Sequence, residues 1–453
     1  MNFTSGIGGM NVERDEFAHS NFNLFENTEY EVGVKKLVSQ IFRPLSTPNT
    51  TGPFSFKIPS DPDKFTIAQS LRLHGRMRIR RKDLVTDVLS NLTTEYVAPI
   101  NNIFDSLWSS INIKLNGCEI TDPSSKWYAY KAYLENHISY SSSCKENVLS
   151  YKGYHKDSPG KFDDVGDSST TTPSSNAGFL KRNELFMGSK WVYFNINLHT
   201  DITTLNKYIP PGIQIELEFQ RNSPKFCLLS DISADNYAIE IDDLSLKVDR
   251  IIPGKNVVDF YKKNIEKKNS PRLPIDRSLL KTYNVTRGLS DLSQYNIITG
   301  NQLPDQVIVV IVDHDAHTGL IGKNPFNFKD YDISEASLVV NGMHEPQELY
   351  KMYKSEGDKV DMYANFLENT GISTDDREIG ITMEDYYGGS FILAWDRTQD
   401  KCNRFHRHIS DSGALSINLK TRTELIENVT VIVYATYSKD LIIDGDRVLT
   451  AAF

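Results

Sequence analysis

The chain has 453 residues, a formal net charge of -9 at pH 7, 39% hydrophobic residues and 24% charged residues. These proportions describe a folded protein with a sizeable core, and the length suits two domains. The acidic balance argues against a protein that coats nucleic acid by neutralising its charge. No apolar run is long enough to predict a membrane span, and the N-terminus lacks the basic and apolar regions of a signal peptide.

The four cysteines are scattered and have no CxxC spacing; they are Cys118, Cys144, Cys227 and Cys402. This pattern favours a reduced intracellular setting and indicates neither a disulfide framework nor a cysteine-based zinc site.

The first half of the chain has mainly strand patterns. Residues 1–28 are polar and rich in Gly and Asn, and they predict a flexible N-terminal arm. A first jelly roll is predicted over 29–235, with one helix at 125–141. The alternation in "RMRIRRK" (76–82) predicts one charged face of a strand, with phosphate binding as a less favoured alternative. The Ser-, Thr- and Asp-rich segment 154–178 predicts a long exposed loop.

The second half repeats this organisation. A strand in "YAIEIDDLSLKVDRIIPG" is expected to open a second jelly roll at 236–453, and an amphipathic helix follows in "NVVDFYKKNIEKKN". "INIKLNGCEI" (111–120) returns as "ASLVVNGMHE" (336–345), and each copy precedes a helix-like run containing Leu-Glu-Asn. "LFMGSKWVYFNINL" similarly parallels "YYGGSFILAWDRT". The predicted fold is all-β: two tandem eight-stranded jelly rolls, a double jelly roll, with short helical insertions.

Two histidine-containing stretches have residue types that bind metals. "DHDAHTG" (313–319) follows a buried strand, and a polar strand extension entering a Gly turn explains its composition without a metal. "RFHRHIS" places His406 and His408 two residues apart, as cupin-like metal sites do, but the further ligands that a cupin needs are distant in sequence. No metal site is therefore predicted. No catalytic motif and no cofactor motif is found, so the chain is not expected to be an enzyme.

The stretch "GLIGKNPFNFKDYDI" (319–333) predicts a rigid connection, because Pro325 fixes a backbone angle while Phe326 and Phe328 can anchor it on a core. Such a connection would suit an intersubunit face. Asn324, Pro325, Phe326 and Phe328 are the intersubunit contact candidates.

The same region carries a family resemblance. "QLPDQVIVVIVDHDAHTGLIGKNPFNFKDYDISEASLVVNG" resembles the second half of the double jelly-roll major capsid proteins of Polinton/Maverick elements and adintoviruses, and "KNPFNF" is its most specific part. "YKAYLENHISYSSSCKENVLSYKGYHKDS", "IPPGIQIELEFQRNSPKFCLL" and the final "NVTVIVYATYSKDLIIDGDR" are similar to further parts of that family. His317 and Thr318 depart from its pattern, and "FMGSKWVYFNINLHTD" matches it loosely.

The resemblance implies a structural capsid subunit without catalysis or cofactors. Three copies would form a pseudo-hexameric trimer that tiles the icosahedral shell of a DNA virus or virus-like transposon. The implied partners are other copies of the chain and a minor capsid or penton protein, without sequence-specific nucleic-acid binding. The implied location is the virion, with synthesis in the host cytoplasm and assembly in the cytoplasm or nucleus.

Two alternatives belong to other functional classes. A tandem β-sandwich could bind a receptor or glycan, using aromatic residues in loops such as "SKWYAY" and "YYGGS". A metal-dependent cupin-like enzyme would use His406 and His408 or the cluster from Asp313 to His317.

Overall fold

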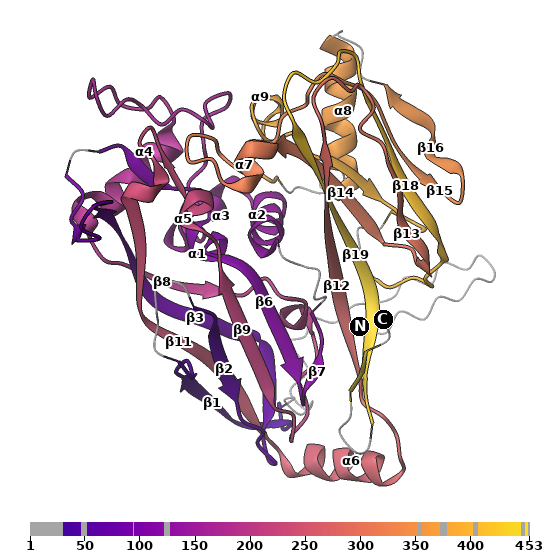
Figure 1. The fold of residues 1–453 in the computed structure, drawn as a ribbon. Helices are drawn as coiled ribbons and strands as arrows, with labels where there is room; N and C mark the ends of the chain where they lie inside the picture. Colours follow the sequence, from indigo (N-terminus) through magenta and orange to yellow (C-terminus); the bar gives the residue numbers. More distant parts are fainter. Residues whose placement is uncertain are drawn as a thin grey trace, which may run out of the picture.

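The computed structural model describes residues 30–46, 52–93, 95–121, 127–351, 356–371, 378–401, 406–444 and 449–451. The predicted N-terminal arm and Cys402 lie outside these ranges. The described chain forms two β-rich lobes that stand side by side, one from the first part of the sequence and one from the second (Figure 1).

Two antiparallel sheets make up the first lobe. One has the order β1-β11-β3-β4, with β8 also paired to β3, and the other has the order β2-β9-β6-β7. The strands are β1 Val34–Phe42, β2 Phe54–Ile58, β3 Phe65–Lys82, β4 Leu89–Ser90, β6 Trp108–Leu115, β7 Cys118–Glu119, β8 Val192–Asn197, β9 Ile215–Arg221 and β11 Tyr237–Pro253, with a small extra pair, β5 Val97–Pro99 and β10 Leu228–Ser230.

The second lobe repeats this arrangement. Its sheets have the orders β12-β19-β14-β17, with β20 also paired to β19, and β13-β18-β15-β16. The strands are β12 Arg272–Val285, β13 Gln294–Gln302, β14 Gln306–Asp313, β15 Ile333–Val340, β16 Met343–Lys351, β17 Leu393–Asp396, β18 Ser412–Thr421, β19 Val429–Ile443 and β20 Leu449–Ala451.

The repeat seen in the sequence is therefore a repeat of topology. β6 and β7 occupy the places that β15 and β16 occupy in the second lobe, and β8 lies on β3 as β17 lies on β14. The Asn-Gly pairs close both hairpins in the left-handed region, with φ of 47° and 81° at Asn116 and Gly117 and of 50° and 84° at Asn341 and Gly342. Two successive positive φ angles characterise the tight turn that this dipeptide favours. The prediction of two tandem jelly rolls is confirmed.

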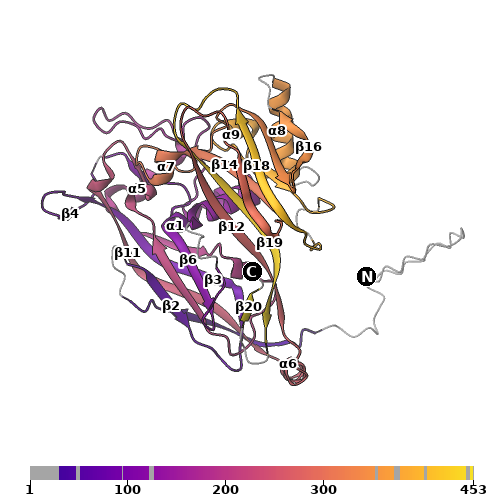
Figure 2. The same cartoon turned by 45° about the vertical axis from the view of Figure 1, so that its right-hand side comes forward.

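Helices fill the connections. The Leu-Glu-Asn repeat lies in α2 Tyr128–Ser139 and α8 Glu356–Asn369, which follow the two Asn-Gly hairpins. The others are α1 Ile103–Ser106, α3 Ser142–Asn147, α4 Ala177–Phe186, α5 Pro224–Cys227, α6 Lys255–Glu266, α7 His314–Thr318 and α9 Met383–Tyr387, with 3-10 turns η2 Ser150–Lys152, η3 Met187–Ser189, η4 Asp201–Thr204 and η5 Ala234–Asn236. Figures 1 and 2 show α6 across one end of the molecule. Across the described ranges, no helix is both long and apolar enough to cross a bilayer.

The buried core extends through both lobes. In the first, Trp108 on β6 is fully buried and meets the rings of Phe54 on β2 and Phe219 on β9 edge-on. In the second, every residue of β14 is buried, because one face of its sheet packs on the partner sheet of the sandwich and the other face lies towards the first lobe. This two-sided burial explains why "QVIVVIVD" is an almost continuous apolar run rather than an alternating one.

The boundary between the lobes falls later than predicted. β11 was expected to open the second jelly roll at residue 236, but it pairs with β1 and β3 and so completes a sheet of the first lobe. The chain then passes through α6 and enters the second lobe at β12. The expected boundary at 235/236 therefore moves to the stretch after Pro253, because strand pairing and not local sequence assigns a strand to a sheet.

The segment 154–178 also differs from its expectation of a uniformly exposed loop. Phe162 is buried, and the Asp157 carboxylate is buried against Arg182 of α4, with 2.7 Å between Oδ1 and Nη2. Residues 169–173 are exposed. Polar composition did not prevent this segment from ordering, because its side chains satisfy one another and the neighbouring backbone through hydrogen bonds.

Candidate functional site

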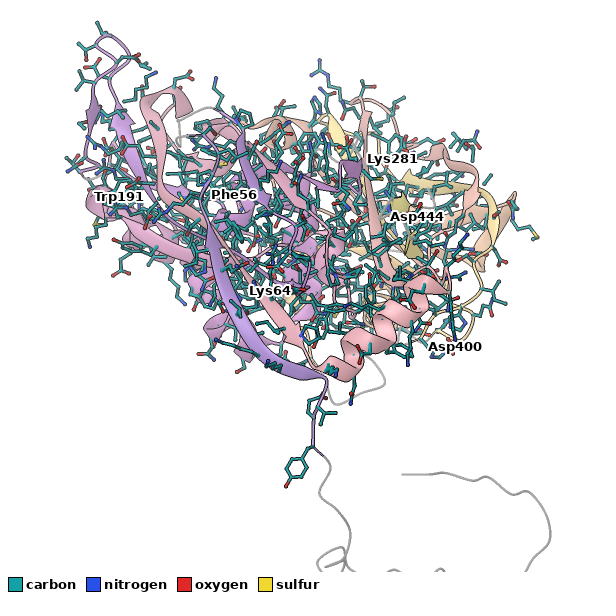
Figure 3. All side chains as sticks on the ribbon, turned by 90° about the horizontal axis from the view of Figure 1, so that it is seen from below. Phe56, Lys64, Trp191, Lys281, Asp400 and Asp444 are labelled. Carbon is teal, nitrogen blue, oxygen red and sulfur yellow. The ribbon has the colours of Figure 1, made fainter. Side chains whose placement is uncertain are left out.

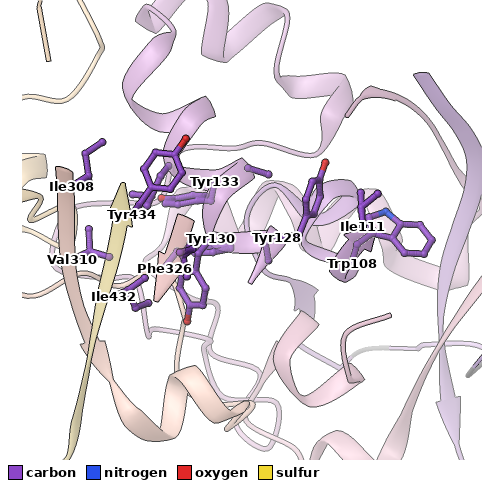
Figure 4. Close-up of a cluster of buried hydrophobic side chains, with 14 of the residues drawn as sticks. Trp108, Ile111, Tyr128, Tyr130, Tyr133, Ile308, Val310, Phe326, Ile432 and Tyr434 are labelled. Atoms are coloured by element: carbon purple, nitrogen blue, oxygen red, sulfur yellow. The ribbon is translucent and has the colours of Figure 1, made fainter. Parts of the chain in front are cut away.

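Among the described residues, we take the contact between the two lobes as the candidate site, because it combines aromatic packing with buried polar contacts. α2 of the first lobe lies against β14, β19 and the 319–333 connection of the second (Figure 4). At its centre the rings of Tyr133 and Phe326 are stacked, with centroids 4.0 Å apart and planes 4° apart. Tyr130 meets Phe326 edge-on at 5.6 Å and also packs on His317 at 5.5 Å. Aromatic rings from both lobes thus form one continuous core.

Beside these rings, a buried ion pair of the first lobe makes hydrogen bonds to the second lobe. Lys131 Nζ on α2 lies 2.5 Å from Asp201 Oδ1 and 2.6 Å from Ser278 Oγ on β12. Ser278 also donates its hydroxyl to the same Asp201 oxygen at 2.6 Å. Tyr434 on β19 donates to Glu135 Oε1 on α2 at 2.8 Å. Because charges buried without partners are costly, this network favours one relative placement of the lobes.

A second polar contact ties α3 to the segment before α9. Lys145 Nζ donates to the carbonyl oxygens of His137 at 2.6 Å and Ile379 at 2.5 Å. Burial lowers the pKa of Lys145 to about 7. The Ser142 backbone N–H and hydroxyl both donate to Glu378, at 2.7 and 2.9 Å. The lobes are thus joined both at the aromatic centre and along this edge.

The predicted contact residues lie inside this contact. Asn324, Pro325, Phe326 and Phe328 are all buried. The backbone N–H of Asn324 donates to Asp163 Oδ1 at 2.7 Å, and Asn327 Nδ2 donates to Asp163 Oδ2 at 2.6 Å. The prediction that Phe326 and Phe328 anchor this connection on a core is therefore confirmed. In the single chain Asn324, Phe326 and Phe328 contact the other lobe. The role of all four residues in an intersubunit contact stays a prediction.

The Asp313–His317 cluster is dispersed. Its residues form α7 rather than the expected strand extension, because Asp313 caps the helix by accepting from Asp315 N at 2.8 Å, and Gly319 ends it at a φ of 100°. Asp313 also binds Lys323, while His314 bonds to Thr430 at 3.0 Å. His317 packs against Trp127 with ring centroids 4.1 Å apart and planes tilted by 43°, and burial lowers the pKa of His317 to about 4. His317 belongs to the lobe contact, whereas Asp313 and His314 bond within the second lobe, so these side chains have separate partners.

The arginine-rich strand face is neutralised by acids. Arg76 and Arg78 on β3 pair with Asp242 and Glu240 across the ladder to β11, each at 2.5 Å. Both guanidinium groups also lie over the ring of Trp191, at 4.7 and 4.3 Å from its centroid, on the face labelled in Figure 3. The expected charged strand face is confirmed, and these cross-strand pairs occupy the groups that phosphate binding would need.

The aromatic residues considered for sugar stacking are unsuited to it. Tyr128 and Tyr130 are buried, Trp127 packs on the core, and Tyr386 is buried with Tyr387 half-buried. The expectation of exposed aromatic loops at "SKWYAY" and "YYGGS" is wrong, because these stretches begin helix α2 and end helix α9.

His406 and His408 do come together with a third side chain. His406 Nε2 lies 2.8 Å from Asp400 Oδ2, and His408 Nε2 lies 2.9 Å from Asp400 Oδ1. Sequence reasoning found the two histidines but missed Asp400, which lies only six residues before His406. It also missed Lys131, Lys145 and Asp163, whose partners are far away in sequence.

No protein-family model matches this sequence. A curated relative, an uncharacterized protein of Caenorhabditis elegans, is 24% identical over 275 residues, which are 60% of this chain and 62% of that protein. The aligned part thus spans less than two thirds of the relative's length.

Solved structures share the whole fold at low sequence identity. The Faustovirus major capsid protein superposes with a TM-score of 0.60 and 9% identity, over 92% of each chain. A chain of the Sputnik virophage gives 0.59 and 12%, over 99% of this chain and 94% of its own. A chain of the PBCV-1 virus capsid gives 0.54 and 10%, over 95% and 99%. The fold is that of double jelly-roll viral capsid proteins.

Proposed function

We propose that this chain is a major capsid protein of the Polinton/Maverick–adintovirus type, which builds the icosahedral shell of a DNA virus or virus-like transposon. It acts by assembly and not by catalysis. Support comes from the double jelly-roll fold, which is shared over nearly the full length of viral capsid chains, and from the sequence blocks around "KNPFNF".

The observation that carries the proposal is the pair of lobes with one strand order, joined through a buried aromatic and hydrogen-bonded contact. A rigid pair of similar lobes is the unit that lets three copies present six similar lobes around one axis. Closed threefold symmetry would then form the capsomer, and separate faces would make the lattice between capsomers.

Further assignments rest on this function. The intersubunit contact near Asn324, Pro325, Phe326 and Phe328 would be made by the exposed surface of the same connection, which includes the half-exposed Leu320. Other copies of the chain and a minor capsid or penton protein are the proposed partners. The proposed location is the virion.

The solution mass of the full-length chain tests the proposal. Size-exclusion chromatography with light scattering should give three times the chain mass of 51.5 kDa. Electron microscopy of the same preparation, concentrated or co-expressed with its minor capsid partner, should show closed particles. A stable monomer at high concentration that forms no particles would contradict the proposal.

A further inference from the structure

Three metal-binding side chains converge at one edge of the second lobe. Asp400 follows β17, His406 and His408 precede β18, and their ligand atoms all lie within 4.8 Å of one another. The two imidazole rings have centroids 4.7 Å apart, and each directs Nε2 to a different oxygen of the same carboxylate. Figure 3 shows Asp400 at the periphery of the molecule, where ions from solvent can reach it.

The backbone around His406 and His408 accounts for their convergence. Arg407, between them, points the other way and pairs with Asp276 and Asp440, each at 3.3 Å. In an extended chain, residues two apart lie on one side and the residue between them on the other. Anchoring Arg407 therefore turns both histidines to the side of Asp400.

The Asp400 side of the site is fixed independently. Lys401 Nζ lies 3.0 Å from Glu368 Oε1 on α8, and Lys401 N donates to Thr398 O at 3.2 Å in a turn after β17. Ser410 Oγ accepts from Gln302 Nε2 at 2.6 Å and holds the chain after His408. Contacts with different parts of the lobe thus hold both sides of the cluster before any ion arrives.

We propose that Asp400, His406 and His408 bind one Zn²⁺ or a similar late transition-metal ion. Two imidazole nitrogens and one carboxylate oxygen are ligands that Zn²⁺ accepts, and a water molecule would complete a tetrahedron. Tetrahedral bonds of about 2.0–2.2 Å place ligand atoms about 3.3–3.6 Å apart. The two Nε2–carboxylate pairs, now 2.8 and 2.9 Å apart, would therefore open by roughly half an ångström to admit an ion. Mg²⁺ and Ca²⁺, which prefer oxygen ligands, should bind far more weakly. The ion would fasten the connection between β17 and β18.

Zinc titration of the full-length chain after chelator treatment tests this site. Competition with a chromophoric chelator should give one equivalent bound, with Asp400→Asn, His406→Asn and His408→Asn each weakening binding at least tenfold. His344→Asn, which changes an exposed histidine elsewhere in the same lobe, should bind zinc as the unaltered chain does. Circular dichroism of each variant, recorded without metal, checks that the fold is retained.

A second readout separates a built site from casual binding by exposed histidines. Co²⁺ should give the visible absorption of tetrahedral coordination in the unaltered chain, and this absorption should disappear in Asp400→Asn. Equal zinc affinity in the unaltered chain and the triple variant D400N/H406N/H408N would overturn the proposal. So would an absence of zinc binding at millimolar concentration.

Discussion

Phe326 of the second lobe stacks on Tyr133 of the first, with ring centroids 4.0 Å apart and an interplanar angle of 4°. Both rings are essentially inaccessible to solvent. Phe326 also contacts Tyr130, and Tyr133 also contacts Phe328. This pair lies at the centre of the lobe contact, so the stability of the two-lobed unit should depend on it.

Phe326→Ala should reduce the free energy of unfolding by about 3–5 kcal/mol, because it leaves a cavity in the shared aromatic core. Urea titration monitored by fluorescence and circular dichroism measures the loss. Phe260→Ala on α6 is the matched control, because the Phe260 side chain is 71% exposed, and it should change stability by less than about 0.5 kcal/mol. Similar losses in the two variants would show that the lobe contact contributes little.

Lys131→Met should also destabilise the chain, by about 3–5 kcal/mol, since it leaves the buried Asp201 carboxylate without its cation. Adding Asp201→Leu to this variant should restore part of the loss, because the unpaired charge is then removed. Arg43→Met breaks a pair whose side chains are 72% and 60% exposed, so its cost should stay below about 1 kcal/mol. If the losses in free energy of unfolding of Lys131→Met and Asp201→Leu simply add in the double variant, the urea titration would contradict this account of the pair.

Acid should weaken the lobe contact through His317. Burial lowers its pKa from 6.5 to about 4 in the folded chain, so the unfolded chain binds more protons between these values. Stability therefore falls as pH decreases from about 6.5 to about 4 and gains no further dependence on His317 below that range. His317→Phe keeps an aromatic ring and should reduce this slope by up to about 1.4 kcal/mol per pH unit. Urea titrations at half-unit pH steps measure this slope. An equal slope in His317→Phe and in the unaltered chain would contradict the assignment to His317.

The two Asn-Gly hairpins should respond alike to one substitution. Gly117→Ala and Gly342→Ala each place a side chain at a φ above 80°, where nothing lies within 4 Å of the new Cβ, so backbone strain alone sets the cost. Each should lose about 1–2 kcal/mol. Gly52→Ala also meets no neighbour, and its φ lies outside the left-handed range, so it should be neutral. Unequal losses at the two hairpins would show that the turns are not equivalent.

Local patterns predicted the repeated elements because each pattern acts within a few residues. The period-two alternation of "IQIELEFQ" matches β9, and the Asn-Gly dipeptides fix the turns at Asn116 and Asn341. The α7 helix was also within reach of the sequence, since Asp313 is a good N-cap and Gly319 a good helix terminator. The interpretation as a strand extension gave these signals too little weight.

What escaped prediction depends on partners that are distant in the chain. No sequence feature near Tyr237 indicates that β11 pairs with β1 and β3 rather than with the strands that follow it. Lys131 lies on α2, most of whose residues are buried, and only the fold brings Asp201 and Ser278 to its amine. Asp400 was missed for a different reason: Asp is common in turns, and only the geometry around Arg407 turns both histidines towards it.

The lobe contact also orders events during translation. Tyr130 and Tyr133 leave the ribosome well before Phe326, their partner 193 residues after Tyr133, so at about 5–20 residues per second they wait roughly 10–40 s. The first lobe is complete only after β11 has been made, at Pro253, and Phe326 follows 73 residues later. For the roughly 4–15 s that these 73 residues take, a complete first lobe presents an aromatic surface that the finished protein buries. Nascent chains arrested before Gly319 should therefore bind a hydrophobic dye or a chaperone more strongly than chains extended well past Phe328. The same contact that joins the two lobes of the finished protein is therefore, during synthesis, an exposed apolar surface that favours aggregation.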